Sequence, residues 1–354
     1  MIPSFYDGSS GVPAPRKRAG YFCTYTPVEI LAAAGFAPLR LEPPQAAGDE
    51  LPPYLAANLC SFARACLTGG VRGVWGKLDL IVVAGSCTAM VHLYSAWRAT
   101  LPSPPVYFLD VPRRSGEEAA TFFAAQLRRL ASVLGLPSGS AGEVLLREAV
   151  ERYVRQRILL RELCGPLSCA GAVYRRAVLR AAERAPAELP TAPPNECYPP
   201  APAGPAIFLT GCVVPDDIVS LVEECGLRVA MDDSCAGSRP LQVGDEAAPS
   251  GEEDLFFNLA RRYLNRAPCP RMTLESRLAY LRSIIKSIPC AGMIYFALKF
   301  CDFAMHDFPQ VRAVFEEAGL PAIFLQGEYG DAATGQMRTR VEAFAELLHR
   351  GWRS

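Results

Sequence analysis

Short apolar runs alternate with amphipathic segments through the second half of the chain. The apolar runs have the length of buried strands and lie at residues 206–212, 227–233, 292–300 and 321–329. The segments that separate or follow them carry apolar residues at helical spacing and lie at residues 215–225, 256–264, 273–287, 311–319 and 339–352. Strands that alternate with helices predict parallel βαβ units in a doubly wound sheet.

The first half repeats this pattern less regularly. Strands are predicted near residues 37–41, within 77–87 and within 104–112. Helices are predicted at residues 27–35, 53–67, 90–100, 117–135, 142–164 and 170–185. The predicted fold class is therefore α/β, with two doubly wound, Rossmann- or flavodoxin-like lobes built on parallel sheets, and with a helical insert.

A segment dense in proline divides the two halves, as is typical of a linker. With 354 residues, the chain is long enough for two domains that each bury a core. The predicted organisation is an N-terminal α/β lobe at residues 1–114, a helical insert at 115–184, a proline-rich linker at 185–205 and a C-terminal α/β lobe at 206–354.

The charge balance narrows the range of partners. The charges of the 36 basic and 36 acidic residues cancel, which argues against non-specific electrostatic binding of nucleic acid or of an anionic membrane. No apolar run approaches the roughly 20 residues that span a bilayer, and the first ten residues, MIPSFYDGSS, lack the layout of a secretory signal. We therefore expect neither nucleic acid nor a membrane as partner, and a cytoplasmic location that keeps thiols reduced.

Cysteine is the unusual component of this sequence. The chain has 13 cysteines, no C-x-x-C pair and only 3 histidines, so a zinc ribbon, a thioredoxin-type pair and a histidine-rich metal site are all disfavoured. A buried thiol can be a plain small hydrophobe. Four cysteines, however, follow predicted strands, where open α/β sheets bind their ligands: Cys87, Cys212, Cys235 and Cys301. Thiolates gathered from separate loops suit a soft centre such as an iron–sulfur cluster.

Several common catalytic motifs are absent. GGVRGVWGKL at residues 69–78 lacks both the spacing of a P-loop and the hydroxyl residue after Lys77, so ATP binding by a P-loop is not expected. No G-x-G-x-x-G, H-E-x-x-H or G-x-S-x-G occurs. Dinucleotide chemistry and serine hydrolysis therefore have little support.

Several stretches of the sequence, taken in their order along the chain, resemble those of a known family. They run from about residue 20 to about residue 346 and are YFCTYTPVEILAAAGFAPLRL, NLCSFARACL, DLIVVAGSC, DDSCAGSR, FFNLARRYLNRAPCP, KFCDF and GQMRTRVEAFAELL. Together they resemble the iron–sulfur subunits of the 2-hydroxyacyl-CoA dehydratase and benzoyl-CoA reductase family. One departure is Thr88, which follows Cys87 where the family often has Asp.

The resemblance implies a [4Fe–4S] cluster at the meeting of the two lobes. Its three ligands, carried over by position, are Cys60, Cys87 and Cys301, and one iron stays open for substrate or solvent. The implied reaction is the elimination of water from a 2-hydroxyacyl-CoA through a one-electron ketyl radical, or the start of aromatic ring reduction. The implied partners are an acyl-CoA substrate, an ATP-hydrolysing iron–sulfur activator protein and a homologous subunit, in a homo- or heterodimer.

Two other interpretations stay open. Cys23 resembles a position in the related double-cubane cluster proteins, where one chain holds an [8Fe–9S] assembly and reduces small molecules without CoA. Further ligand candidates in that case are Cys66, Cys235 and Cys269. In the second of these interpretations, the chain is a non-catalytic partner subunit that relays electrons or completes a heterodimer.

Four charged residues are further candidates. Glu29 follows Pro27 at a helix start and is either an acid/base group facing the cluster or an acid favoured there by the helix dipole. Arg239, Arg338 and Arg340 are candidates for contacts with CoA phosphates, although arginines are common on protein surfaces.

Overall fold

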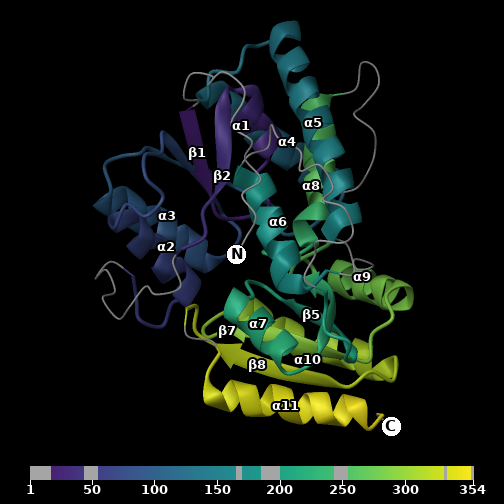
Figure 1. The fold of residues 1–354 in the computed structure, drawn as a ribbon. Helices are drawn as coiled ribbons and strands as arrows, with labels where there is room; N and C mark the ends of the chain where they lie inside the picture. The colour runs from purple at the N-terminus through teal and green to yellow at the C-terminus, as the bar shows by residue number, and fades with distance from the viewer. Residues whose placement is uncertain are drawn as a thin grey trace, which may run out of the picture.

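Two parallel sheets form the framework of the protein. The computed structural model describes residues 17–43, 55–164, 170–184, 200–242, 254–330 and 333–351. Each sheet has four strands, and every pair of neighbouring strands is parallel. The sheets belong to two lobes that lie one above the other in Figure 1. The predicted α/β class with two doubly wound lobes is confirmed.

The first lobe has the strand order β2-β1-β3-β4. Its strands are β1 Lys17–Tyr21, β2 Phe36–Arg40, β3 Leu80–Ala84 and β4 Val106–Leu109. One face packs on α1 Val28–Ala33, α4 Glu117–Val133, α5 Ser140–Cys164 and α8 Leu255–Leu264. The other face packs on α2 Ser61–Val71 and α3 Thr88–Thr100. Helices on both faces explain why β3 is apolar at all five positions.

The second lobe has the order β6-β5-β7-β8, which is the same order counted from its own first strand. Its strands are β5 Ala206–Gly211, β6 Arg228–Asp233, β7 Gly292–Leu298 and β8 Ala322–Gly327. One face packs on α7 Asp216–Glu224 and α11 Gly335–His349. The other packs on α9 Leu274–Ser287 and α10 Asp302–Glu317. The short 3-10 helix η1 Arg239–Leu241 follows β6.

The chain crosses between the lobes more than once. Phe123 and Leu127 of α4 and Leu146 of α5 belong to the core of the first lobe, so the predicted helical insert covers that lobe. Helix α8, which lies in the predicted C-terminal lobe, also packs into the first lobe, and Figure 1 shows it beside α5. Helix α6 Ala172–Arg184 contacts elements of both lobes. Residues 185–199 of the predicted linker lie outside the described residues.

One strand and two helix starts differ from the prediction. Strand β1 is central in its sheet but was not predicted, because its five residues begin with two cations and contain Gly20. The helix predicted at 53–67 is wrong before Ser61, since Leu55 and the residues up to Cys60 are not helical. The helix predicted at 311–319 begins nine residues earlier, at Asp302, and continues through Pro309.

The shared strand order fixes where a ligand can bind. In both lobes the chain leaves the first strand toward one side and returns to the third strand on the other side, so a crevice opens between these neighbours at their carboxyl ends. The described part of the chain contains no helix that combines the length and apolarity needed to cross a bilayer.

Candidate functional site

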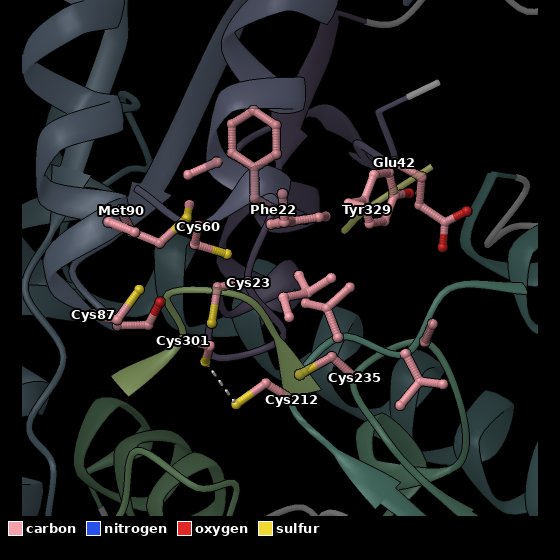
Figure 2. Close-up of a pocket in the computed structure, with 18 of the residues that line it drawn as sticks. Phe22, Cys23, Glu42, Cys60, Cys87, Met90, Cys212, Cys235, Cys301 and Tyr329 are labelled. Atoms are coloured by element: carbon pink, nitrogen blue, oxygen red, sulfur yellow. Dashed lines mark hydrogen bonds between the residues drawn. The ribbon is translucent and has the colours of Figure 1, made fainter. Parts of the chain in front are cut away.

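A cavity of about 360 Å³ lies between the two lobes and is lined by thiols from both. Figure 2 shows six of them around one space, with the sulfur atoms of Cys212 and Cys301 facing each other. The cysteines that line the cavity are Cys23, Cys60, Cys87, Cys212, Cys235, Cys269 and Cys301. Seven thiols on one cavity are far more than the ordinary burial of cysteine explains.

The thiols come from equivalent positions of the two lobes. Cys23 follows β1 and Cys87 follows β3, the two strands that flank the crevice of the first lobe. Cys212 follows β5 and Cys301 follows β7, the corresponding strands of the second lobe. Each pair therefore lies where its sheet is built to bind a ligand, and the two crevices face one cavity.

Three of the thiols stand at the start of a helix. Cys60, Cys87 and Cys301 are the residues that precede α2, α3 and α10, and each has a non-helical backbone conformation. The first backbone N–H groups of a helix have no partner within it and carry partial positive charge. These three sulfur atoms are therefore placed where a negative charge is stabilised.

The pKa values of two of these thiols show the opposing effects. Burial raises the pKa of Cys60 to about 12, against the backbone N–H groups of Phe62 and Ala63, which favour the thiolate. Burial likewise raises the pKa of Cys87 to about 11. Burial thus favours the neutral form of both thiols, and a metal that bound them would have to displace their protons.

Cys212 and Cys301 form a close pair at the carboxyl ends of β5 and β7. Their Sγ atoms lie 3.8 Å apart and share a hydrogen bond. That bond to Cys212 lowers the pKa of Cys301, whereas the pKa of Cys212 is raised well above its ordinary value by the same bond and by burial. The pair therefore carries one negative charge, with one proton retained, more readily than it carries two negative charges.

The donor set fits a cluster better than a single ion. Among the described residues, no group of three or more Cys, His, Asp or Glu side chains lies close enough to hold one metal ion. A cluster places its irons at separate corners, so its ligand sulfurs stand farther apart than those around one ion. Several thiols on the wall of one cavity are the type of donor set that an iron–sulfur cluster uses.

The charged side chains of the cavity wall are mostly paired. Arg40 contacts Glu183 at 3.3 Å, and Arg180 bonds to Glu42 and to Asp216. Arg271 also lines the cavity but has no carboxylate partner among the described residues. The remaining wall is largely apolar, from residues such as Phe22, Met90, Leu298 and Tyr329.

Comparison with known proteins identifies the family. The family described as 2-hydroxyglutaryl-CoA dehydratase, D-component, matches residues 23–348, a span that includes all seven cavity thiols. The chain belongs to this family. The predicted resemblance is thereby confirmed.

Relatives in this family include subunits of two dehydratases and a reductase. The (R)-phenyllactyl-CoA dehydratase beta subunit of Clostridium sporogenes is 23% identical over 347 residues, which cover 94% of this chain and 92% of the relative. The lactoyl-CoA dehydratase subunit beta of Anaerotignum propionicum is 24% identical, over 93% and 91% of the two chains. A benzoyl-CoA reductase subunit of Thauera aromatica is 22% identical, over 94% and 91%.

This member of the dehydratase family brings most of the predicted ligands together. Cys60, Cys87 and Cys301 line the cavity, as do the further candidates Cys23, Cys235 and Cys269. Cys66 does not: it lies on α2 with no exposed surface, in the apolar core beneath the sheet.

Glu29 lies away from the cavity wall. Its side chain is fully buried, forms an ion pair with Arg157 and accepts a hydrogen bond of 2.7 Å from the Tyr263 hydroxyl. Burial alone would raise the pKa of Glu29, but Arg157 and Tyr263 hold it below its ordinary value. The carboxylate therefore joins α1 to α5 and α8, and this placement gives no support to an acid/base role.

The three arginines predicted to contact CoA phosphates are also placed elsewhere. Arg239 is fully buried and donates to the Asp233 carboxylate, to the Gly211 carbonyl and, at 3.6 Å, to Cys235 Sγ. Arg338 is exposed on α11 and pairs with Glu224. Arg340 is exposed on the same helix. None of the three lines the cavity.

Two features of the site were missed from the sequence. Cys212 was recognised at a strand end but was not predicted as a ligand, although it follows the first strand of its lobe as Cys23 does. Arg40 and Arg180 line the cavity and carried no sequence signal. Arg40 on β2 and Arg180 on α6 reach the same cavity because α6 packs against β2 in the folded chain.

Proposed function

We propose that the chain is the iron–sulfur subunit of an ATP-activator-dependent 2-hydroxyacyl-CoA dehydratase. In this proposal Cys60, Cys87 and Cys301 hold a [4Fe–4S] cluster that keeps one iron open. The observation that carries the proposal is that these three thiols, each at the start of a helix, line one cavity between the lobes. The description of the matched family and the two dehydratase subunits among the relatives support dehydration, and aromatic ring reduction is the alternative that the reductase subunit suggests.

The chain's own residues prepare the site for this chemistry. A cluster held by Cys60, Cys87 and Cys301 would supply an open Lewis-acidic iron and a one-electron reductant for the loss of water from the substrate. The apolar wall formed by Phe22, Met90 and Leu298 keeps water from the reacting centre. The helix starts at Cys60, Cys87 and Cys301 stabilise the negative charge of the ligand sulfurs.

The CoA portion of the substrate requires a route to solvent. A second cavity of about 390 Å³ adjoins the first and shares Arg40, Glu42 and Arg180 with it. Arg18 also lines this second cavity. We assign the CoA phosphates to these arginines, in place of the three predicted from the sequence, because guanidinium groups bind phosphates in bidentate fashion.

One observation favours a second candidate, a double-cubane reductase of small molecules. Each lobe contributes one thiol after its first strand, one between its second and third strands and one after its third: Cys23, Cys60 and Cys87 in the first lobe, and Cys212, Cys235 and Cys301 in the second. Two sets of three thiols match an [8Fe–9S] assembly better than a single cubane.

Metal analysis of anaerobically prepared protein tests both candidates. About four irons per chain support the dehydratase, about eight support the double cubane, and the absence of iron overturns both. Lactoyl-CoA and phenyllactyl-CoA serve as probes of binding. With the dehydratase, Arg180→Gln weakens binding roughly tenfold by loss of a charged hydrogen bond, whereas Arg340→Gln on α11 leaves it unchanged. Equal binding by both variants removes the phosphate assignment.

A further inference from the structure

One loop ties together the thiol-bearing loops of the first lobe. Residues 265–273 connect α8 to α9, and Cys269 in this loop lines the cavity. We call residues 265–273 the arginine loop, after Arg266 and Arg271. Its contacts reach the residues beside two of the cavity thiols.

The two arginines bond to backbone and hydroxyl oxygens. Arg266 donates to the Thr24 carbonyl and, at 2.6 Å, to the Thr24 hydroxyl, next to Cys23. Arg271 donates to the Ser86 carbonyl at 2.9 Å, next to Cys87. Arg271 also donates at 2.8 Å to the carbonyls of Val111 and Pro112, which follow β4.

Both guanidinium groups are buried, and no described carboxylate pairs with either of them. Arg266 is 3% exposed and Arg271 is 5% exposed. Neither forms an ion pair with a carboxylate of the described residues; instead, their guanidinium carbons lie 3.8 Å and 4.6 Å from the centre of the Tyr25 ring. A buried charge without a partner is costly, so an anion is expected nearby.

The cavity supplies the place for that anion. Arg271 lines the cavity and the arginine loop contributes Cys269 to its wall. A cluster held by thiolates carries net negative charge, and reduction adds one more negative charge. A fixed cation beside it therefore favours the reduced form.

We propose that Arg271, assisted by Arg266, is a positioning residue that holds the loops of Cys87 and Cys23 and raises the reduction potential of the bound cluster. This inference rests on the proposed cluster. It does not depend on which substrate is reduced or dehydrated.

The experiment compares reduction potentials of the full chain after anaerobic assembly of the cluster. Wild type, Arg271→Gln and Arg271→Lys are titrated and followed by EPR, with iron per chain measured on each sample. Arg271→Gln is expected to retain iron and to be reduced about tenfold less favourably, a shift of about 59 mV to more negative potential. Arg271→Lys keeps the charge and is expected to stay close to wild type.

The control is Arg282→Gln, which removes an exposed arginine paired with Glu317 and leaves the potential unchanged. An unchanged potential in Arg271→Gln overturns the inference, and so does an equal fall in the Gln and Lys variants, because charge would then not be the cause. If Arg271→Gln does not fold, Arg266→Gln replaces it, with a smaller shift in the same direction expected and no shift contradicting the proposal.

The same samples separate the two proposals. Wild-type protein that binds no iron overturns the proposed function. Protein that holds a cluster without dehydratase activity, but shows the predicted shift in potential, supports the inference about Arg271 on its own.

Discussion

The two lobes share one strand order and treat their buried charges differently. Each lobe presents thiols at the carboxyl ends of its first and third strands. In the second lobe the buried arginines Arg239 and Arg277 are paired with Asp233, at 3.0 Å and 2.8 Å. In the first lobe the buried arginines that reach the thiol loops, Arg266 and Arg271, have no carboxylate among the described residues.

The difference separates two uses of a buried cation. Around Asp233 the charges satisfy one another, and Thr210 adds a further hydrogen bond of 2.8 Å, so this cluster fixes the ends of β5 and β6. At the arginine loop the positive charge remains available to the cavity. The repeated topology therefore determines where ligands lie, whereas the charged residues determine what each lobe does to them.

The largest effect is expected from the thiols that the two lobes contribute jointly. If the proposed ligand set holds, Cys87→Ala in the first lobe and Cys301→Ala in the second should each abolish stable cluster binding, since each removes one of its three thiolates. Iron per chain and the EPR signal measure this. Cys290→Ala is the matched control, because Cys290 is partly buried but does not line the cavity. Full iron retention in either variant excludes that residue from the ligand set.

The paired cluster of the second lobe should be essential to stability. Asp233→Ala leaves two fully buried arginines without their shared carboxylate and is expected to lower the free energy of unfolding by about 3–5 kcal/mol. Chemical denaturation measures the change. Glu317→Ala removes the exposed partner of Arg282 and should cost at most about 1 kcal/mol. A similar loss in both variants would show that burial of the pair is unimportant.

Glu29 offers the corresponding test in the first lobe, with a defined pH dependence. Its folded-state pKa lies below the ordinary value, so the carboxylate contributes stability above the ordinary pKa, and this contribution is lost as the pH falls through the folded-state pKa. Glu29→Gln should therefore destabilise by about 1.5–3 kcal/mol at neutral pH and by less in acid. Unfolding measured from neutral to acid pH checks this, with Glu346→Gln on α11 as an exposed control.

The smallest effect is expected at the loop that delivers Cys301. Phe300 has a φ of 62°, in the left-handed region, and is half exposed. Phe300→Gly should stabilise the protein by up to about 1 kcal/mol, because glycine adopts this conformation without strain. Phe122→Gly, at an exposed position inside α4, should instead destabilise by roughly 1 kcal/mol. If Phe300→Gly lowers the stability instead, the Phe300 side chain makes a stabilising contact that outweighs the backbone strain.

Helices and strands with a complete apolar pattern were predictable from the sequence. Elements whose position depends on contacts with distant parts of the chain were not. Strand β7 and helix α7 were predicted nearly to the residue, since their apolar patterns are complete. Strand β1 was missed because its five residues, with two cations and Gly20, form no apolar run, and its place at the sheet centre comes from its pairing with β2 and β3. Proline within α10 hid the start of that helix, and with it the position of Cys301 before the first turn.

The candidate site shows the same limit. The apolar pattern located the strand ends, so Cys87 and Cys301 could be placed at the edge of a sheet from the sequence. The buried pairing of Glu29 with Arg157 and of Arg277 with Asp233 joins helices and strands from separate segments, so no local spacing could reveal it. The arginine loop was missed for this reason too: its contacts with Thr24 and Ser86 span more than 180 residues of sequence.

The order in which the thiols occur along the chain has a consequence for biosynthesis. Cys23 is among the first described residues, whereas Cys301 lies beyond β7, near the end of the second lobe. A ribosome must therefore release most of the polypeptide before a complete binding chamber exists. The cavity is therefore complete only when both lobes have folded around the same space.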